Sequence, residues 1–318
     1  MSDGPSWIGI GAQRCGTTWF ADLLVQHPQM AVGATPTGKK VKEHHTLYRY
    51  GLTRDWDRDA RDRYRATFTS GDLKLGEFTP YYLRANWACE VAADALPEDT
   101  PIIVLVRDPI DRFASALRHE MTLATGRYRE FMKAVTGHKP SDESSAEREQ
   151  GLPQRLVSRF RRNRFVATAL AEGAMWFLAR PKVPFQQHLD NNWIRYIGSD
   201  ATWGGMFASQ LAAWTSVLPV ERFIVIQYEK LRENPQHYTD LVWRRIGLEP
   251  VQLTDVDRRR GSTNTPKWRR NFGLEAWLPE DHPNVVRALQ QIYRPDAKRL
   301  ASSFDIDLDL WKRTMTDA

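Results

Sequence analysis

The chain has 318 residues, of which 42% are hydrophobic and 26% charged, a globular composition that suffices for one large domain or two small ones. Its net charge of +6 suits an anionic ligand, a nucleic acid or an anionic membrane surface equally well. No run approaches the ~18 apolar residues of a membrane span, and the start MSDGPSW lacks a secretory signal pattern. Two cysteines exclude a disulfide framework, so we expect a cytoplasmic protein.

The first predicted elements are a strand, a glycine loop and a helix. The apolar run over 7–10 predicts a buried strand, and the apolar spacing over 17–26 predicts a helix. Between them, GAQRCG followed by two threonines has the skeleton of the phosphate-binding loop G-x-x-x-x-G-K-[ST]. Thr17 replaces the usual lysine, and Arg14 adds a cation inside the loop. Backbone N–H groups, the helix N-terminus and the hydroxyls of Thr17 and Thr18 predict an anion site; the alternative is a bare strand–helix turn.

Two further apolar runs, over 101–106 and 222–228, predict buried strands that are each followed by a helix. Those helices are expected from Ile110 onward and over 236–246. Apolar runs that alternate with helices predict an α/β protein, with a P-loop-like three-layer fold and a central parallel β-sheet flanked by helices. Ligands of such sheets bind at the carboxyl ends of the strands.

The region at about 120–199 has its apolar residues too scattered for a core of its own. We therefore expect one domain over 1–318 that carries a mostly helical or mobile insertion there. An arginine-rich stretch over 155–164 lies inside this insertion. One interpretation of this stretch is a solvated helix face.

The segment RDPIDRFASALRH follows the second strand and predicts another phosphate contact. Arg107 stands at the strand end, and Arg112, Ser115 and His119 share one face of the next helix because they are three and seven residues apart. An arginine from a strand end and a serine from the adjoining helix are able to bind one phosphate together. The alternative is a solvated helix start with a structural Arg–Asp pair.

Two other segments gather chemically active side chains. GKKVKEHHTLY places a cation, an acid and two imidazoles side by side: Lys42, Glu43, His44 and His45. GEFTPYYL predicts a strand that carries Glu77 into a Thr-Pro turn, followed by Tyr81 and Tyr82. The alternative for Glu43 is an ordinary surface glutamate.

At these four segments the chain resembles the sulfotransferases that use 3′-phosphoadenosine-5′-phosphosulfate (PAPS), closest to their carbohydrate- and heparan-type branch. The family's G-x-[RK]-[SCT]-G-[TS]-[TS] loop is matched at 11–18, and its K-E-x-H segment at 42–45. Its [EK]-x-[TS]-P-x-Y-[FL] and R-[DN]-P-x-x-R-x-x-S segments are matched at 77–83 and 107–115. WGGMFASQLAAW and VIQYEKLRENP resemble its later helix and strand–turn.

The resemblance implies PAPS as co-substrate, adenosine 3′,5′-bisphosphate as product, and no metal. The residues it implies for the nucleotide are Gln13, Arg14, Cys15, Gly16, Thr17, Thr18, Trp19, Arg107 and Ser115. The stretch over 258–272 matches the family's C-terminal cofactor loop only loosely, with Lys267 and Arg269 as candidates. Cys15 is expected to be a small packing residue, with a thiol of lowered pKa as the alternative.

The same resemblance implies a mechanism of in-line sulfuryl transfer. Arg14 would stabilise the charge that develops on the leaving phosphate, and Glu43 would act as general base, with His45 as second choice. Lys42 would steer the anionic nucleotide. The residues assigned to the acceptor are His44, Glu77, Tyr81 and Tyr82. Besides a solvated helix face, the arginine-rich stretch over 155–164 has two further interpretations, a lid over the acceptor and a contact for an anionic acceptor.

Two other classes of protein remain as alternatives. A P-loop kinase or NTPase would share the loop, but it needs the missing lysine and a magnesium ion. A nucleic-acid-binding protein would explain the basic charge and predicts binding that weakens steeply with salt. We expect instead a small-molecule, glycan or glycolipid acceptor, without nucleic acid and without integral membrane association.

Overall fold

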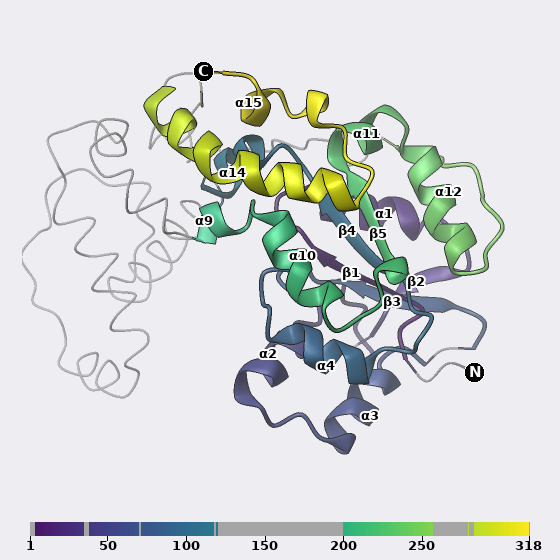
Figure 1. Cartoon of the computed structure of the whole chain (residues 1–318). Helices are drawn as coiled ribbons and strands as arrows, with labels where there is room; N and C mark the ends of the chain where they lie inside the picture. Colours follow the sequence, from purple (N-terminus) through teal and green to yellow (C-terminus); the bar gives the residue numbers. More distant parts are fainter. Residues whose placement is uncertain are drawn as a thin grey trace, which may run out of the picture. The chain divides into compact units, whose positions relative to one another are not determined.

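The sheet is built from the apolar runs that the sequence marks as strands. The computed structural model describes residues 4–34, 38–69, 71–117, 119, 200–256, 279 and 283–317. Its strands are β1 (Trp7–Gly11), β2 (Met30–Val32), β3 (Lys74–Phe78), β4 (Ile102–Val106) and β5 (Phe223–Gln227). They form one parallel sheet in the order β2-β3-β1-β4-β5 (Figure 1). Every residue of β1 and β4 is buried, as expected for strands covered on both faces.

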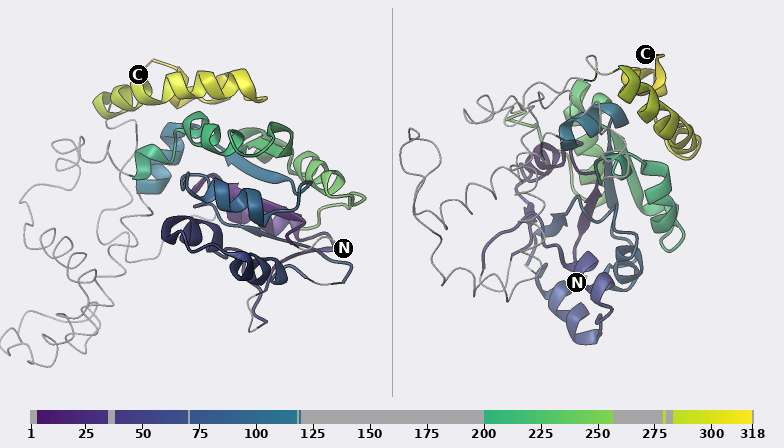
Figure 2. Two further views of the ribbon diagram at one scale, coloured as in Figure 1. Left: turned by 60° about the horizontal axis from the view of Figure 1, so that its bottom comes forward. Right: turned by 90° about the vertical axis from the view of Figure 1, so that its left-hand side faces the viewer.

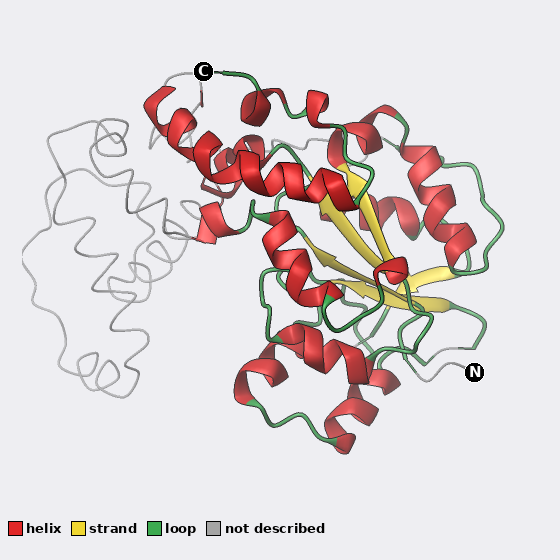
Figure 3. Cartoon of the chain, in the orientation of Figure 1, coloured by secondary structure: helices red, strands yellow, loops and turns green. Residues whose placement is uncertain are grey.

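Helices flank this sheet (Figure 3). In the first half of the chain they are α1 (Thr17–Leu24), α2 (Thr46–Thr53), α3 (Arg58–Ala66) and α4 (Ala88–Ala95). In the second half they are α9 (Asp200–Trp203), α10 (Phe207–Thr215), α11 (Tyr228–Glu233), α12 (Pro235–Arg245), α14 (Pro283–Ser303) and α15 (Lys312–Met315). Helix α1 packs on α12, α2 on α4, and α10 on α14. The turned views in Figure 2 show α14, in yellow, as the outermost element on its side of the sheet.

The predicted parallel α/β architecture is confirmed. The strands β1, β4 and β5 and the helices α1 and α12 end within two residues of the predicted positions. A helix also begins at residue 109, one residue before the expected start. No strand was predicted at β2 and no helix at α14, because three residues are too few for a clear period and Pro295 interrupts the pattern of α14.

The strand order determines where the motifs meet. From β1 the chain passes to β2 and β3 on one side and then to β4 and β5 on the other. The carboxyl end of β1 therefore lies between those of β3 and β4, at the point where the winding of the sheet reverses. Ligands of open parallel sheets bind at this switch point.

The described residues belong almost entirely to one compact unit, formed by 1–116, 194–264 and 278–318. The insertion expected at about 120–199 lies outside the described residues, so the one-domain organisation stays a prediction. Among the helices that the structure describes, none combines the length and the apolar character needed to cross a membrane.

Candidate active site

The glycine loop connects β1 to α1 and ends in a backbone turn that only glycine fits. Gly16 has a φ of 86°, in the left-handed region. A Cβ atom at Gly16 would also lie 2.6 Å from the ring of Tyr228, so a side chain is excluded twice. Helix α1 has no side-chain cap at its N-terminus, which leaves its first N–H groups available to an anion. The exposed Arg14, with a φ of 72°, stands beside this N-terminus.

Two side chains from the helix after β4 bind the loop. The Nε of Arg14 donates a hydrogen bond to Ser115 Oγ over 3.0 Å, although the two residues are 101 positions apart. Arg112 is completely buried; its Nε donates to the carbonyl of Gln13 over 3.0 Å, and its Nη1 donates to the carbonyl of Ala201. The loop and the R-x-x-S segment therefore form one site. Arg112 appeared in the sequence only as a neighbour of Ser115 on the helix, and its role is to hold the loop.

Arg107 lies at the carboxyl end of β4 and faces the same region. Its guanidinium lies 5.0 Å from the ring centroid of Tyr228, and its Nη2 lies 3.9 Å from a carboxylate oxygen of Asp111. A quarter of the Arg107 side chain is exposed. Tyr228, the first residue of α11, thus contacts both Gly16 and Arg107, and its ring meets that of Trp19 edge to face. The Tyr-Glu pair after β5 was visible in the sequence, but no role in the site was predicted for it.

The Lys42–His45 segment brings its carboxylate to the N-terminus of α1. The ammonium of Lys42 donates to Thr18 Oγ1 over 3.0 Å and lies 2.9 Å from Glu43 Oε1. The other oxygen of Glu43 lies 3.5 Å from Nε2 of His45. The Glu43 side chain is 37% exposed. A lysine from a separate segment thus supplies positive charge beside the loop that lacks its own lysine.

Glu77, predicted to contact the acceptor, is instead a buried hub. It is 0% exposed. Its carboxylate accepts hydrogen bonds from four donors: the N–H of His44 (3.1 Å) and the hydroxyls of Tyr64 (2.7 Å), Thr79 (2.5 Å) and Tyr82 (3.1 Å). It has no exposed atom for an acceptor, and its contacts instead fix the segment that carries Glu43.

Tyr82, also predicted as an acceptor contact, is fully buried beside Glu77. Its hydroxyl accepts a hydrogen bond from the N–H of Thr46, at the start of α2, over 3.0 Å. Burial, together with the nearby Glu77 carboxylate, raises the pKa of Tyr82 and of Tyr64 well above the usual value. Both phenols therefore stay protonated and act as donors to Glu77, in a positioning rather than a binding role.

Replacing Glu77 by leucine is expected to lower the free energy of unfolding by about 2–5 kcal/mol, because it leaves several buried donors without an acceptor. Urea unfolding of the purified variant measures the change. The matched control is Glu90→Leu, at an exposed position of α4, which should change stability by less than about 0.5 kcal/mol. Equal stability of the Glu77 variant and the wild type would contradict the stabilising role of the Glu77 hydrogen bonds.

Tyr81 contributes to a partly exposed aromatic surface next to His45, whose ring centroid lies 5.8 Å from that of Tyr48. Its ring lies 4.8 Å from that of Tyr48, and the guanidinium of Arg84 lies 3.9 Å from its centroid. His44 packs its ring against Phe68 at 5.2 Å, while its N–H is bound by Glu77. Of the four residues that the sequence assigned to the acceptor, Tyr81 and His44 thus keep some exposed surface, whereas Glu77 and Tyr82 have none.

Cys15 is fully buried inside the loop. Burial raises the pKa of its thiol to about 12, against the lowering effect of the nearby Arg112, Arg107 and Arg14. The thiol therefore remains protonated at neutral pH, where it is a poor nucleophile. This favours the interpretation of Cys15 as a small packing residue.

Several predicted features fall outside the described residues. They are Lys267 and Arg269, in the stretch over 258–272, and the arginine-rich stretch over 155–164. Within the part of the chain that the structure describes, no three His, Cys, Asp or Glu side chains gather in a way that would hold a metal ion.

A parallel sheet whose switch point carries a glycine loop and an uncapped helix N-terminus is typical of the class of α/β proteins that hold phosphate groups at a helix N-terminus. The family model described as "Sulfotransferase domain" matches residues 5–260. The chain therefore belongs to the sulfotransferase family and is a transferase of that class.

The fold agrees with a solved structure, a sulfotransferase from Alicyclobacillus acidocaldarius. The two chains share 18% sequence identity with a TM-score of 0.55, and the match covers 97% of this chain and 98% of that one. At this identity the likeness concerns the fold alone. No protein of curated function matches the sequence significantly.

Proposed function

We propose that the protein transfers the sulfuryl group of PAPS to a hydroxyl or amine of a small-molecule, glycan or glycolipid acceptor, as in the carbohydrate-type branch of the family. The observation that carries this proposal is the 3.0 Å bond between Arg14 and Ser115. It joins the loop expected to hold a 5′-phosphosulfate to the segment expected to hold a 3′-phosphate. A triphosphate-binding protein has no need of the second segment.

The residues present fit a nucleotide with two separate anionic ends. The loop N–H groups, the uncapped N-terminus of α1 and the Thr17 and Thr18 hydroxyls suit one end. Arg107 and Ser115 suit the other, because charge-assisted bonds from a guanidinium are the strong ones. Gln13, Cys15, Gly16 and Trp19 complete the loop, and Lys267 and Arg269 remain candidates for the same nucleotide.

In the reaction, the bond from sulfur to the bridging phosphate oxygen breaks while a bond from sulfur to the acceptor atom forms. Arg14 stabilises the negative charge that collects on the leaving phosphate. Glu43 accepts the proton that the acceptor releases, and His45, 3.5 Å away, orients this carboxylate. Lys42 contacts both Thr18 and Glu43, so it supplies positive charge between the nucleotide and the base. Positive charge from these side chains and from N–H groups is the only electrostatic assistance that the proposal invokes.

The partly exposed aromatic surface beside His45 supports an acceptor with a flat ring or an apolar sugar face, since the ring centroids of His45 and Tyr48 lie 5.8 Å apart. Tyr81 and Tyr48 form this surface, and Arg84 covers one side of the Tyr81 ring. Aromatic faces of this kind stack well on rings. His44 would contribute from the neighbouring segment.

The proposal predicts tighter binding of adenosine 3′,5′-bisphosphate than of AMP, because only the bisphosphate engages Arg107 and Ser115. A lost charge-assisted contact costs ~1.5–3 kcal/mol, so the affinities should differ about ten- to a hundredfold. Calorimetry in the presence of EDTA measures both constants.

Equal affinity for the two nucleotides would contradict the 3′-phosphate site. Tight binding of ATP that requires magnesium would favour the kinase or NTPase alternative. A protein that binds polynucleotide instead, with an affinity that falls steeply with salt, would favour the nucleic-acid alternative.

A further inference from the structure

The last short helix of the chain, α15, contacts the turn that follows β4. The carboxylate of Asp108 is 2% exposed, and two residues of α15 bind it. Its Oδ1 accepts from the hydroxyl of Thr314 over 2.7 Å, and its Oδ2 accepts from the N–H groups of Arg313 and Thr314 over 2.9 and 3.2 Å. Asp108 directly follows Arg107, so the end of the chain fixes the residue next to the proposed 3′-phosphate contact.

A second carboxylate, that of the partly buried Glu229, makes a similar connection. Trp311, which precedes α15 and is fully buried, donates from Nε1 to Glu229 over 3.2 Å. The other oxygen of Glu229 accepts from the N–H of Asp108 over 3.0 Å. Burial raises the pKa of Glu229. Residues 311–314 thus bind Asp108 in two ways. Arg313 and Thr314 bind its carboxylate directly, and Trp311 is connected to its backbone N–H through Glu229.

Arg313 and Arg107 form ion pairs with the same carboxylate, that of Asp111. The Nε of Arg313 lies 2.8 Å from one oxygen of Asp111, whereas Arg107 lies 3.9 Å from the other. The shorter ion pair is the stronger one. The Asp111 carboxylate therefore neutralises Arg313 more than Arg107. The positive charge of Arg107 stays available to an external anion.

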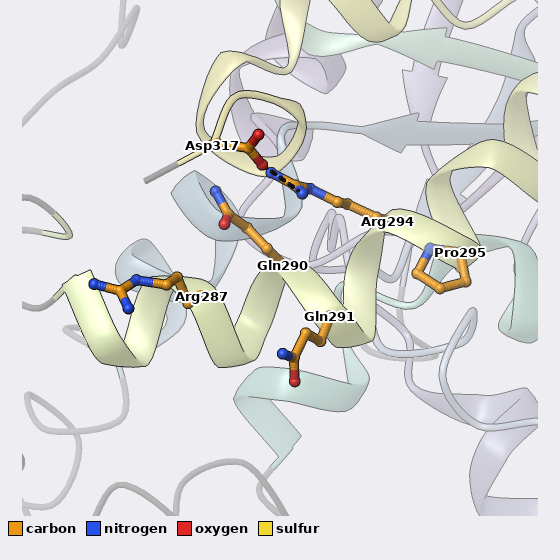
Figure 4. A pocket seen from close by; sticks show the side chains of 6 residues that line it. All are labelled: Arg287, Gln290, Gln291, Arg294, Pro295 and Asp317. Atoms are coloured by element: carbon orange, nitrogen blue, oxygen red, sulfur yellow. Dashed lines mark ion pairs between the residues drawn. The ribbon is translucent and has the colours of Figure 1, made fainter.

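Helix α14 also contacts this terminal segment; Figure 4 shows Arg294 of α14 beside Asp317, with their ion pair as a dashed line. The amide of Gln290 donates to the carbonyls of Arg313 and Thr316 over 2.9 and 2.7 Å. Arg294 donates to the carbonyls of Thr314 and Thr316 over 2.8 and 3.0 Å and forms an ion pair with Asp317 at 2.9 Å.

We propose that residues 311–317 form a C-terminal clasp that positions Arg107 for the 3′-phosphate of the nucleotide. The inference rests on the proposed function, because that function assigns the 3′-phosphate to Arg107. The clasp lies beyond residues 5–260, the region that the family model matches. Thr314, Arg313 and Trp311 are positioning residues: none of them needs to touch the nucleotide.

The test compares the ratio of affinities for adenosine 3′,5′-bisphosphate and AMP in the full-length protein. Thr314→Val removes the hydroxyl that Asp108 accepts while keeping the shape of the side chain, and should reduce this ratio about three- to tenfold. Thr314→Ser restores the donor and should restore the ratio. The matched control is Thr239→Val, a fully buried threonine of α12 whose hydroxyl donates only to carbonyls of its own helix, and it should leave the ratio unchanged.

Arg313→Gln is the second variant. The Arg313 side chain is 37% exposed, so we expect this variant to fold even if Thr314→Val does not. Arg313→Gln removes the ion pair with Asp111, so Asp111 pairs more closely with Arg107 and the ratio falls here too. A wild-type protein that does not discriminate between the nucleotides contradicts the proposed function itself. The clasp alone is overturned if the wild type prefers the bisphosphate and both variants keep its ratio of affinities. It is also overturned if both variants lose affinity for the two nucleotides equally.

Discussion

Replacing Glu43 by glutamine is expected to reduce turnover by about 100- to 10,000-fold, the usual contribution of a positioned general base. Glutamine keeps the size of the side chain and its hydrogen-bonding reach, but it does not accept the acceptor's proton. Affinity for adenosine 3′,5′-bisphosphate should stay nearly constant, because the bisphosphate contacts are assigned to other residues. Steady-state kinetics with PAPS and calorimetry with the bisphosphate measure the two quantities separately.

The control for this variant is Glu90→Gln, an exposed glutamate on α4 far from the loop in sequence, which should leave turnover unchanged. His45→Ala should have a smaller effect than Glu43→Gln, since His45 lies 3.5 Å behind the carboxylate as an orienting partner. If Glu43→Gln keeps most of its turnover while His45→Ala abolishes it, the two roles must be exchanged.

Replacing Arg14 by alanine should lower kcat by about 100- to 1,000-fold, the range found when one donor to a developing negative charge is removed. Ground-state affinity for the nucleotide should fall much less, because the charge on the leaving phosphate grows only during the transfer. The backbone contributes little to the difference, since arginine already occupies the left-handed region there with a φ of 72°. Arg14→Lys should retain part of the activity because it keeps the cation.

Ser115→Ala distinguishes nucleotide binding from transition-state stabilisation at the contact between Arg14 and Ser115. It removes the partner of Arg14 Nε and a proposed 3′-phosphate donor, so it should weaken nucleotide binding more than Arg14→Ala does. A change confined to KM in Arg14→Ala would make this arginine a binding residue and would contradict its role in the transition state.

The sequence predicts those parts of the site that depend on neighbouring residues. Gly11 and Gly16, five positions apart between an apolar run and a helix, predict the loop, and the short segment Lys42–His45 predicts the cation beside its carboxylate. Parallel strands place the segments that follow them at one edge. The meeting of Arg14 with the segment that begins at Arg107 follows from that rule.

Local sequence patterns do not predict which polar side chains are buried or which residues far apart in the sequence contact each other. Glu77 is a polar residue in a half-apolar strand, and only the fold reveals that four donors surround it. Arg112 resembles any solvated arginine at a helix start, yet it is completely buried under the loop. The bond between Asp108 and Thr314 spans 206 positions, and no local pattern marks either residue as a partner of the other.

The most direct test of the central claim is incubation of the protein with sulfur-labelled PAPS and a metabolite extract of its source cells, in the presence of EDTA. We expect label to move from PAPS to a new product identifiable by mass. We also expect adenosine 3′,5′-bisphosphate to appear in equal amount, and Glu43→Gln to form ~1% or less of either. Label that stays in PAPS with the wild-type protein, or a transfer that Glu43→Gln carries out as well as the wild type, would contradict sulfuryl transfer with Glu43 as the base.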